Sequence, residues 1–199
     1  MLISVINYKG GQGKSTWAAI LADWADADLI DLDVTNGDTY AWCKKSGRVC
    51  QLPPRGDEDK VMAAAAADKD KWYVADSPPH DFLETRIALQ RSHLVVVPLV
   101  PGGAQDARAW GRMMDALQKA RPLNPGLKAA VVLNAYRQTA MAKEFVTMLK
   151  EWHQPKHGQA VLGVVPQRVA IAEAFGAGRV PWDEEIAVVL KKLATFAKN

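Results

Sequence analysis

The sequence predicts a doubly wound α/β domain, in which helices cover both faces of a mainly parallel sheet. Short apolar runs alternate along the chain with segments whose apolar residues recur at helical spacing. The runs are apolar throughout, as in strands that are buried on both faces of a parallel sheet. With 199 residues and no internal repeat or long linker, the chain is expected to form a single domain over residues 1–199.

Seven segments are predicted as strands. In chain order they are residues 2–7, 28–32, 49–52, 72–75, 94–99, 129–133 and 161–165. Polar side chains lie beyond four of them: Lys14 after the first, and Asp33, Asp76 and Asn134 after the second, fourth and sixth. Because ligands of such sheets bind at the carboxyl ends of the strands, these four side chains are expected to gather around one site.

The helices are predicted from apolar residues that stand three or four positions apart. Such residues mark a helix over about 14–25, and alanine-rich residues 58–68 favour a helix by propensity. Residues 84–90 suit a short helix, whereas residues 34–45 show no clear pattern. Three later helices are marked by Ala107, Trp110, Met114 and Leu117, by Ala142, Phe145, Leu149 and Trp152, and by Ile186, Val189, Leu190, Leu193 and Ala197.

The composition is that of an ordinary water-soluble domain. Hydrophobic residues make up 49% of the chain and charged residues 24%, and the formal net charge is +3. No apolar run approaches the roughly 20 residues that a membrane-spanning helix needs. The apolar start of the chain is too short for a signal peptide. Cys43 and Cys50 form neither a disulfide framework nor a metal-binding motif, so a cytoplasmic location is expected.

A glycine-rich segment between the first strand and the first helix predicts a phosphate site. It reads Tyr8-Lys9-Gly10-Gly11-Gln12-Gly13-Lys14-Ser15-Thr16. Glycines let backbone N–H groups approach a phosphate, and the start of the following helix adds a positive end. Lys14 is expected to contact the β- and γ-phosphates, and Ser15 to offer its hydroxyl to Mg²⁺. The bound nucleotide is therefore predicted to be a Mg²⁺–triphosphate.

This segment departs from the general phosphate-loop pattern G-x-x-x-x-G-K-[ST], because Tyr8 stands where that pattern has its first glycine. It satisfies instead the deviant form K-G-G-x-G-K-[ST]. In this form the chain resembles the ParA/MinD family of partition and positioning ATPases. The resemblance implies ATP as the nucleotide, and it implies that Lys9 reaches across a dimer to the nucleotide of the other subunit.

Further segments extend the resemblance to about residues 2–182. Asp33 matches the family aspartate that orients the attacking water, with Asp31 in a supporting role. Asp76, followed by Ser77 and two prolines, is similar to the aspartate that holds a Mg²⁺-bound water. Asn134 matches the asparagine that reads the adenine edge, where an amide both donates and accepts hydrogen bonds. The segment beginning near Pro166 is similar to the loop that packs beside the base.

Two departures from the family are visible in the sequence. After Asp33 the family usually continues with Pro-Gln, whereas this chain has Val34-Thr35-Asn36-Gly37-Asp38. In this segment the chain resembles the smaller plasmid-borne relatives, including conjugation-associated ones. His80 stands where a small residue is commoner, so fast hydrolysis is not implied.

The resemblance implies a switch that dimerises with ATP and opens after slow hydrolysis. It also implies non-specific DNA binding in the ATP state, a place on the nucleoid, and stimulation by a centromere-binding or other small adaptor protein. Arg168, Arg179, Lys191 and Lys192 are basic residues that could meet DNA phosphates or simply form a solvated face.

Two functions of other classes remain open from the sequence. The amphipathic last segment, residues 184–199, could bind a membrane surface, although a helix packed on the core needs the same apolar stripe. A small-molecule phosphotransferase could use the same loop, but Lys9, Asp33 and the lack of an acceptor-binding segment favour the switch. Substitution of Lys9 separates the two, because only the switch should depend on it.

Overall fold

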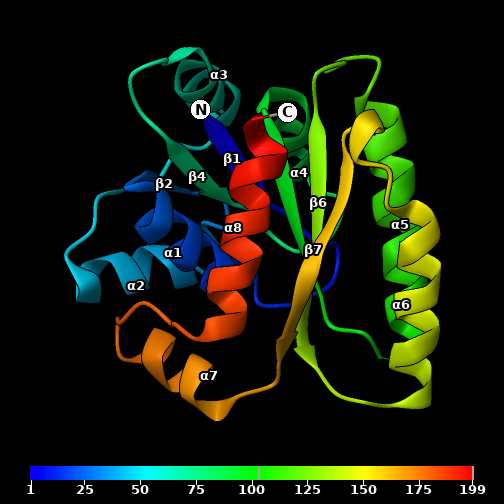
Figure 1. Cartoon of the computed structure of the whole chain (residues 1–199). Helices are drawn as coiled ribbons and strands as arrows, with labels where there is room; N and C mark the ends of the chain where they lie inside the picture. The colour runs from blue at the N-terminus through cyan, green and yellow to red at the C-terminus, as the bar shows by residue number, and fades with distance from the viewer. Residues whose placement is uncertain (103, 199) are drawn as a thin grey trace.

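The computed structural model describes residues 1–102 and 104–198, so that Asn199, the last residue of the predicted closing segment, lies outside it. Its centre is a seven-stranded sheet in the order β3-β2-β4-β1-β5-β6-β7, and every pair of neighbouring strands is parallel (Figure 1). The predicted doubly wound fold is therefore confirmed. The strands are β1 (Leu2–Val5), β2 (Asp28–Asp31), β3 (Cys50–Gln51), β4 (Tyr73–Asp76), β5 (Leu94–Leu99), β6 (Lys128–Tyr136) and β7 (Gln159–Pro166).

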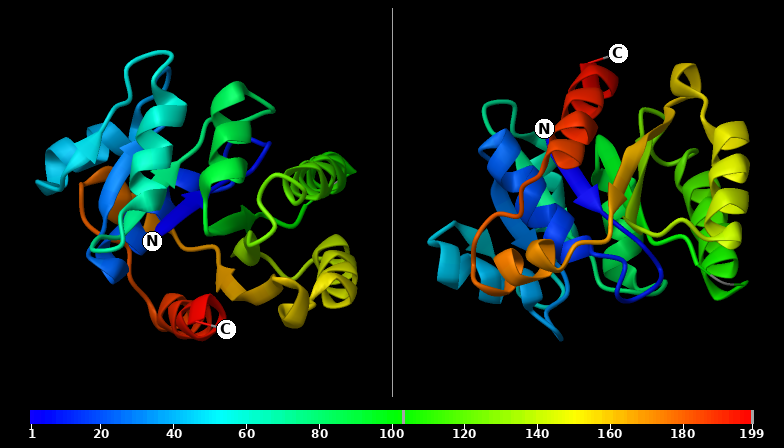
Figure 2. Two further views of the ribbon diagram at one scale, coloured as in Figure 1. Left: turned by 90° about the horizontal axis from the view of Figure 1, so that it is seen from above. Right: turned by 60° about the horizontal axis from the view of Figure 1, so that its bottom comes forward.

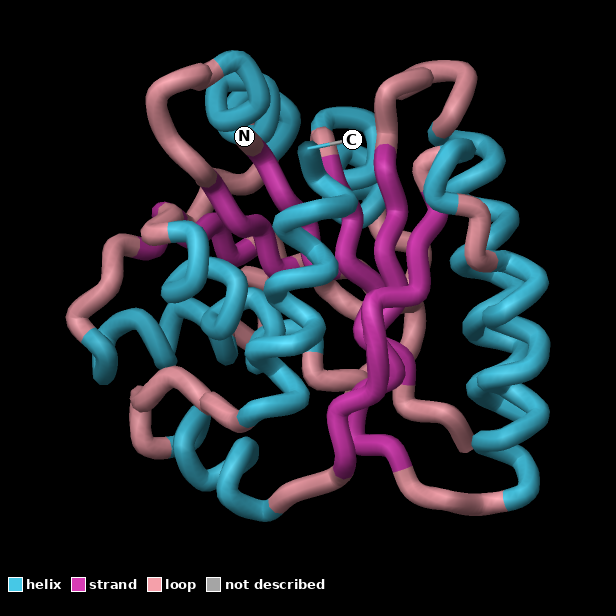
Figure 3. Tube along the Cα trace, in the orientation of Figure 1, coloured by secondary structure: helices cyan, strands magenta, loops and turns pink. Residues whose placement is uncertain are grey.

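Helices cover both faces of this sheet (Figures 1 and 2). One face carries α1 (Lys14–Ala25), α2 (Asp38–Ser46), α7 (Val169–Gly176) and α8 (Glu184–Lys198). The other carries α3 (Glu58–Ala67), α4 (Leu83–Arg91), α5 (Ala104–Ala120) and α6 (Ala140–Trp152). The tube in Figure 3 shows the strands running between these two layers.

The buried strands divide their side chains between two cores. In β5, Leu94 and Val96 join the core beneath α1 and α8, whereas Val95, Val97 and Leu99 join the core beneath α4 and α5. This alternation follows from the two-residue period of a strand. It explains why these strands are apolar throughout, since both of their faces are covered.

Two helices, α2 and α7, lie in segments where the sequence predicted none. Helix α7 has only eight residues, and none is fully buried, although Ile171 and Phe175 pack against the core. In the helix predicted around Trp110, Met113 rather than Met114 is the buried methionine. Strands β6 and β7 extend beyond their predicted bounds, through irregular pairing near Leu133 and Tyr136.

The last helix packs on the core. Its apolar stripe, which includes Ile186, Val189 and Leu193, is buried against the sheet, and α8 lies along β7 in Figure 1. Within the described residues, no helix has the length and apolar character to cross a bilayer.

The chain reverses its winding around β1. From β1 the next strands, β2 and β3, lie to one side, and the later strands β5, β6 and β7 lie to the other. Such a switch point opens a crevice at the carboxyl ends of the strands, and the glycine-rich loop leaves β1 at this point.

Candidate functional site

The glycine-rich loop lies between β1 and α1, as its sequence predicts. Gly11 and Gly13 adopt left-handed backbone conformations, with φ of 72° and 86°, which favour glycine. Gly13 is also the residue that precedes α1, so Lys14 and Ser15 occupy the first turn of that helix. The loop therefore presents the backbone amides of a helix N-terminus, which is a favourable place for an anion.

Neighbouring strands brace the loop through two side chains. The Asn134 amide, on β6, donates a 2.9 Å hydrogen bond to the Gln12 carbonyl oxygen. The Gln12 side chain in turn accepts a 2.7 Å hydrogen bond from the Val100 amide, just beyond β5. Asn134 lies so close that a Cβ atom added to Gly13 would stand 2.4 Å from its Nδ2 atom. The loop is thus fixed from the side on which the sequence places the adenine-reading residue.

Lys14 is buried at the base of the loop, with 8% of its surface exposed. Burial lowers the pKa of its ammonium group, against the opposing effect of three carboxylates, Asp76, Asp33 and Asp38. Lys14, Asp33 and Asp76 are therefore brought together, as the sequence predicts. The Lys14 ammonium group and the helix N-terminus favour an anionic ligand, whereas the carboxylates favour a cation bound beside it.

Asp76 is a buried carboxylate with an incomplete set of partners. Its Oδ2 atom accepts a 2.7 Å hydrogen bond from the Thr39 hydroxyl, and its Oδ1 atom is buried without a hydrogen-bond partner. Burial raises the pKa of Asp76 to about 7, although the hydroxyls of Ser15 and Thr39 and the charge of Lys14 act to lower it.

These features fit a hydrated Mg²⁺ ion. Carboxylate and hydroxyl oxygens are the ligands that Mg²⁺ prefers, and the ion usually keeps several waters and binds phosphate oxygens as well. The unpartnered Oδ1 atom of Asp76, beside the Ser15 hydroxyl, is a ready acceptor for a metal-bound water.

The two aspartates after β2 differ in their surroundings. Asp31 is buried and accepts 2.9 Å hydrogen bonds from the backbone amides of Asp33 and Tyr40, so it braces the turn into α2. Burial raises the pKa of Asp31 to about 6. Asp33 is half-buried, and its carboxylate accepts hydrogen bonds from the backbone and side-chain nitrogens of Asn36 at 3.3 and 2.8 Å. Its position beside Lys14 places a carboxylate near the phosphate end of the site.

Thr39 is a site residue that the sequence did not reveal. It is fully buried in the first turn of α2, where its hydroxyl bonds Asp76. The only signal for this helix is the spacing of its buried residues Thr39, Trp42 and Cys43. The residue before α2 is Gly37 in a left-handed conformation, so the usual capping side chain is missing as well.

Lys9 forms an ion pair with Asp106, in the first turn of α5 of the same chain. The Lys9 side chain is 35% exposed, and its backbone amide donates a 2.9 Å hydrogen bond to the Asn7 side chain. Asn7 is itself anchored to the Pro98 carbonyl oxygen. Lys9 is therefore partly exposed and held toward α5, whereas Lys14 is buried.

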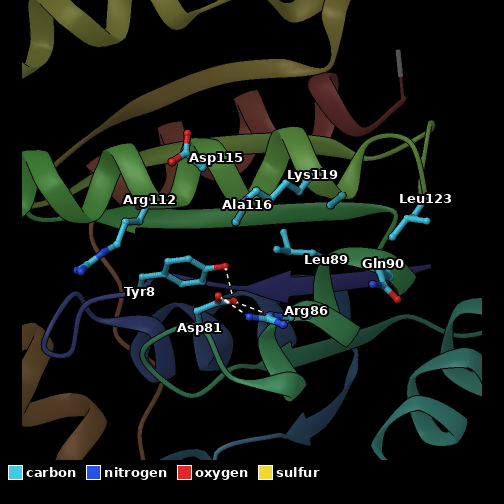
Figure 4. A pocket seen from close by; sticks show the side chains of 11 residues that line it. Tyr8, Asp81, Arg86, Leu89, Gln90, Arg112, Asp115, Ala116, Lys119 and Leu123 are labelled. Carbon is cyan, nitrogen blue, oxygen red and sulfur yellow. Dashed lines mark hydrogen bonds and ion pairs between the residues drawn. The ribbon is translucent and has the colours of Figure 1, made fainter.

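Tyr8 does not occupy the phosphate side of the loop. Its ring is buried below α5, and its hydroxyl donates a 3.2 Å hydrogen bond to Asp81 (Figure 4). The side chain that breaks the general glycine pattern thus points away from the site into a pocket between α4 and α5.

Pro166 ends β7 directly beside Tyr136, the last residue of β6. Asn134 and Pro166 are therefore on adjacent strands at the same edge of the sheet. The remaining loop residues, Gly10 and Thr16, lie at its exposed tip and in the first turn of α1.

Comparison with known proteins assigns this arrangement to a family. Residues 3–182 match the profile of the CobQ/CobB/MinD/ParA nucleotide binding domain. The chain belongs to this family. The resemblance to ParA and MinD proteins is thereby confirmed at the level of the nucleotide-binding domain. No functionally curated protein sequence matches the chain significantly.

Several solved structures share the fold over nearly the whole chain. A Borrelia burgdorferi protein described as a plasmid partition protein, crystallised with AMPPNP, has a TM-score of 0.78 at 17% identity and covers 99% of this chain and 98% of its own. An ATP complex of McdA from Cyanothece has a TM-score of 0.71 at 14% identity, over 97% and 96%. The cell division protein MinD of Aquifex aeolicus has a TM-score of 0.69 at 17% identity, over 98% and 97%.

Proposed function

We propose that this protein is an ATP-dependent dimeric switch of the plasmid-partition type. The observation that carries the proposal is the loop itself, in which one glycine-rich turn holds a buried lysine, Lys14, and a partly exposed one, Lys9. Lys14 neutralises the nucleotide of its own subunit, and Lys9 turns toward a second subunit when it leaves its partner Asp106. Two proteins of the same fold, one crystallised with AMPPNP and one with ATP, support the choice of nucleotide.

Within one subunit, each site residue has a separate task. The backbone of residues 10–15 and the Lys14 ammonium group hold the phosphates. Ser15 and Asp76 would hold Mg²⁺, which supplies positive charge to the phosphate oxygens. Asp33 orients the attacking water, and Thr39 keeps the Asp76 carboxylate in place. Asn134 and Pro166 flank the adenine.

Dimerisation is the step that requires Lys9 to move. In the structure its ammonium group is paired with Asp106 of the same chain. To reach a nucleotide in a second subunit, Lys9 must exchange this partner for a phosphate. A phosphate carries more negative charge than one carboxylate, so bound ATP favours the exchange. Hydrolysis removes that phosphate and favours the return of Lys9 to Asp106.

The output of the switch is proposed to be non-specific DNA binding. The protein is then cytoplasmic and associates with the nucleoid. A centromere-binding or other small adaptor protein is proposed to stimulate its turnover. Exposed Lys191 and Lys192 on α8 are the candidate DNA contacts. Arg168 is a weaker candidate, because its guanidinium group already binds Glu185 and Asp183.

DNA binding gives a direct test of this output. The protein is mixed with a labelled DNA duplex, Mg²⁺ and either ATP or ADP, at low and high salt. We expect salt-sensitive binding with ATP and much weaker binding with ADP. Equal binding with the two nucleotides, or none at low salt, would contradict the proposal.

Membrane positioning is the alternative of the same family, and α8 is the segment on which it rests. The apolar stripe of α8 is buried in the core and is not free to enter a lipid surface. We therefore expect the protein to remain unbound to anionic vesicles in a flotation experiment with ATP. Flotation with ATP but not with ADP would favour the membrane alternative.

A further inference from the structure

A groove between α4 and α5 lies outside the proposed nucleotide site. It consists of a pocket of about 410 Å³, bounded by both helices, and a smaller one of about 210 Å³ that continues it toward Lys9 and His80. Tyr8 and Arg112 line both pockets, so the two form one depression, called here the α4–α5 groove. Figure 4 shows its larger part, with Tyr8 on the floor and α5 along one wall.

The cations of this groove are only partly neutralised. Arg86 makes a two-pronged ion pair with Asp81, at 2.9 and 2.7 Å. By contrast, Arg108, Arg112 and Lys119 form no ion pair with any residue in the described parts of the chain. All three are exposed and follow one another at helical spacing along α5. The described lining holds two carboxylates, Asp115 on α5 and Asp81, which is paired with Arg86. The free charge of this wall is therefore positive.

The floor and far end of the groove are apolar. Leu89 on α4 and Ala116 and Ala120 on α5 line the larger pocket, and Leu123 at its end is 67% exposed. An apolar floor beside a cationic wall suits an amphipathic peptide whose leucine-like side chains pack down and whose carboxylates face α5. A nucleic acid backbone offers no apolar side chains for this floor, so the groove fits a peptide better.

We propose that the α4–α5 groove docks an acidic amphipathic segment of a partner protein. Two carboxylates about two helical turns apart would meet Arg112 and Lys119, and an apolar side chain between them would pack on Ala116. Docking of such a segment does not depend on the proposed function. Only the identity of the partner, as the adaptor that regulates turnover, rests on the proposed function. Through Tyr8, whose backbone begins the phosphate loop, the groove is joined directly to the nucleotide site.

The His80 backbone strengthens this connection. His80 lines the smaller pocket with a left-handed backbone, at φ of 75°, and its amide donates a 3.2 Å hydrogen bond to the Tyr8 carbonyl oxygen. A segment that enters the groove therefore meets the side chain of Tyr8 and the loop that holds its backbone.

A model peptide tests the surface without nucleotide. The probe is a fluorescein-labelled helical peptide of about 14 residues, with glutamates on one face and leucines on the other, and its counterpart has lysine for each glutamate. Fluorescence anisotropy is measured with the nucleotide-free full-length protein. We expect saturable binding of the acidic peptide, weakened by salt, and no binding of the basic peptide.

Charge reversal locates the binding. In R112E/K119E, affinity for the acidic peptide should fall at least about tenfold, and in R112A/K119A it should fall by a smaller factor. The matched control K150E, on exposed α6, should bind as the wild type does. Absence of saturable binding to the wild type, or equal affinity in R112E/K119E and K150E, would overturn the proposal.

Two further outcomes are distinguished in the same experiment. If a DNA duplex competes for the groove and loses affinity in R112E/K119E but not in K150E, the groove is a nucleic acid site and the proposal is overturned. Binding of an ATP analogue is measured in parallel on the same variants. If the wild type does not bind the ATP analogue, the proposed switch is contradicted, whereas the peptide result remains valid.

Discussion

Gly13 and Asn134 restrict each other in the phosphate loop. The left-handed backbone of Gly13, with φ of 86°, and the 2.4 Å approach of Asn134 both exclude a Cβ atom. We expect G13A to lower the free energy of unfolding by about 1–2 kcal/mol for the backbone alone, and to lose binding of an ATP analogue. Urea unfolding and nucleotide titration measure the two effects.

Gly10 provides the matched control for this prediction. A Cβ atom at Gly10 would meet nothing within 4 Å, and its backbone is not left-handed. G10A should therefore change stability by less than about 0.5 kcal/mol. If G13A were as stable as G10A, the close approach of Asn134 would not constrain the loop.

Asp76 makes stability depend on pH. Its pKa rises from 3.8 to about 7 on folding, so the folded state holds a proton that the unfolded chain releases in this interval. The wild type should therefore lose stability as pH rises from about 4 to about 7, with nucleotide absent and a chelator present. D76N removes this titration and should be relatively more stable at pH 8 than at pH 5, by at least about 1 kcal/mol.

Urea unfolding of the wild type and D76N at several pH values measures this difference. Asp31, whose pKa rises to about 6, contributes a slope of the same sign in both proteins, and its charge also helps to raise the pKa of Asp76 in the wild type. Parallel stability profiles of the two proteins would show that Asp76 is ionised without cost.

At the residue scale, the sequence predicts the parts of the site that are contiguous. Lys14, Ser15 and the glycines follow from one motif, and Asp33 and Asp76 follow from their places after strands. The match of Asn134 to the family asparagine is visible in the sequence. Its contact with the loop depends on the order of the strands. Thr39 could not be predicted in the same way, because only the folded structure brings its hydroxyl to Asp76.

At the scale of elements, α2 links the carboxylates of the site. Its first turn supplies the Thr39 hydroxyl to Asp76 and the Tyr40 amide to Asp31. The helix was not predicted because it is short, largely polar and preceded by glycine rather than a capping side chain. Longer elements with a buried stripe, such as α1 and α8, were predicted because their packing leaves a periodic trace in the sequence.

The role of α2 is tested by T39V. Valine keeps the shape of the side chain but removes the donor to Asp76, so a buried carboxylate oxygen loses its partner. We expect a loss of about 1–3 kcal/mol in the free energy of unfolding, together with weaker Mg²⁺-dependent binding of an ATP analogue. Exposed Thr35 supplies the control T35V, which should behave as the wild type in both measurements. Indistinguishable behaviour of T39V and T35V would remove Thr39 from the site.

At the scale of the whole molecule, strand order converts scattered residues into one site. The sheet places β4 and β5 on either side of β1. Asp76 at the end of β4 and Val100 beyond β5, whose amide binds the Gln12 side chain, therefore meet the loop that leaves β1. Continuous apolar strands predicted the parallel sheet, because both of its faces are covered. The order of the strands and the extensions of β6 and β7 depend on long-range pairing, which a local reading of the sequence does not contain.

The whole molecule also carries the central claim, that ATP closes a dimer through Lys9. The structure shows Lys9 paired with Asp106 in one chain, and the switch requires that this pair be exchanged for contacts with a second subunit. K9A should still bind nucleotide, because Lys14 and the loop backbone remain. The exposed α3 residue Lys60 provides the control K60A.

Light scattering coupled to size-exclusion chromatography measures this claim most directly, with Mg²⁺ and either AMPPNP or ADP. We expect the wild type and K60A to have the mass of a dimer with AMPPNP and of a monomer with ADP, and K9A to remain a monomer with both. An unchanged wild-type mass in the two nucleotides, or dimerisation of K9A equal to that of the wild type, would contradict the account.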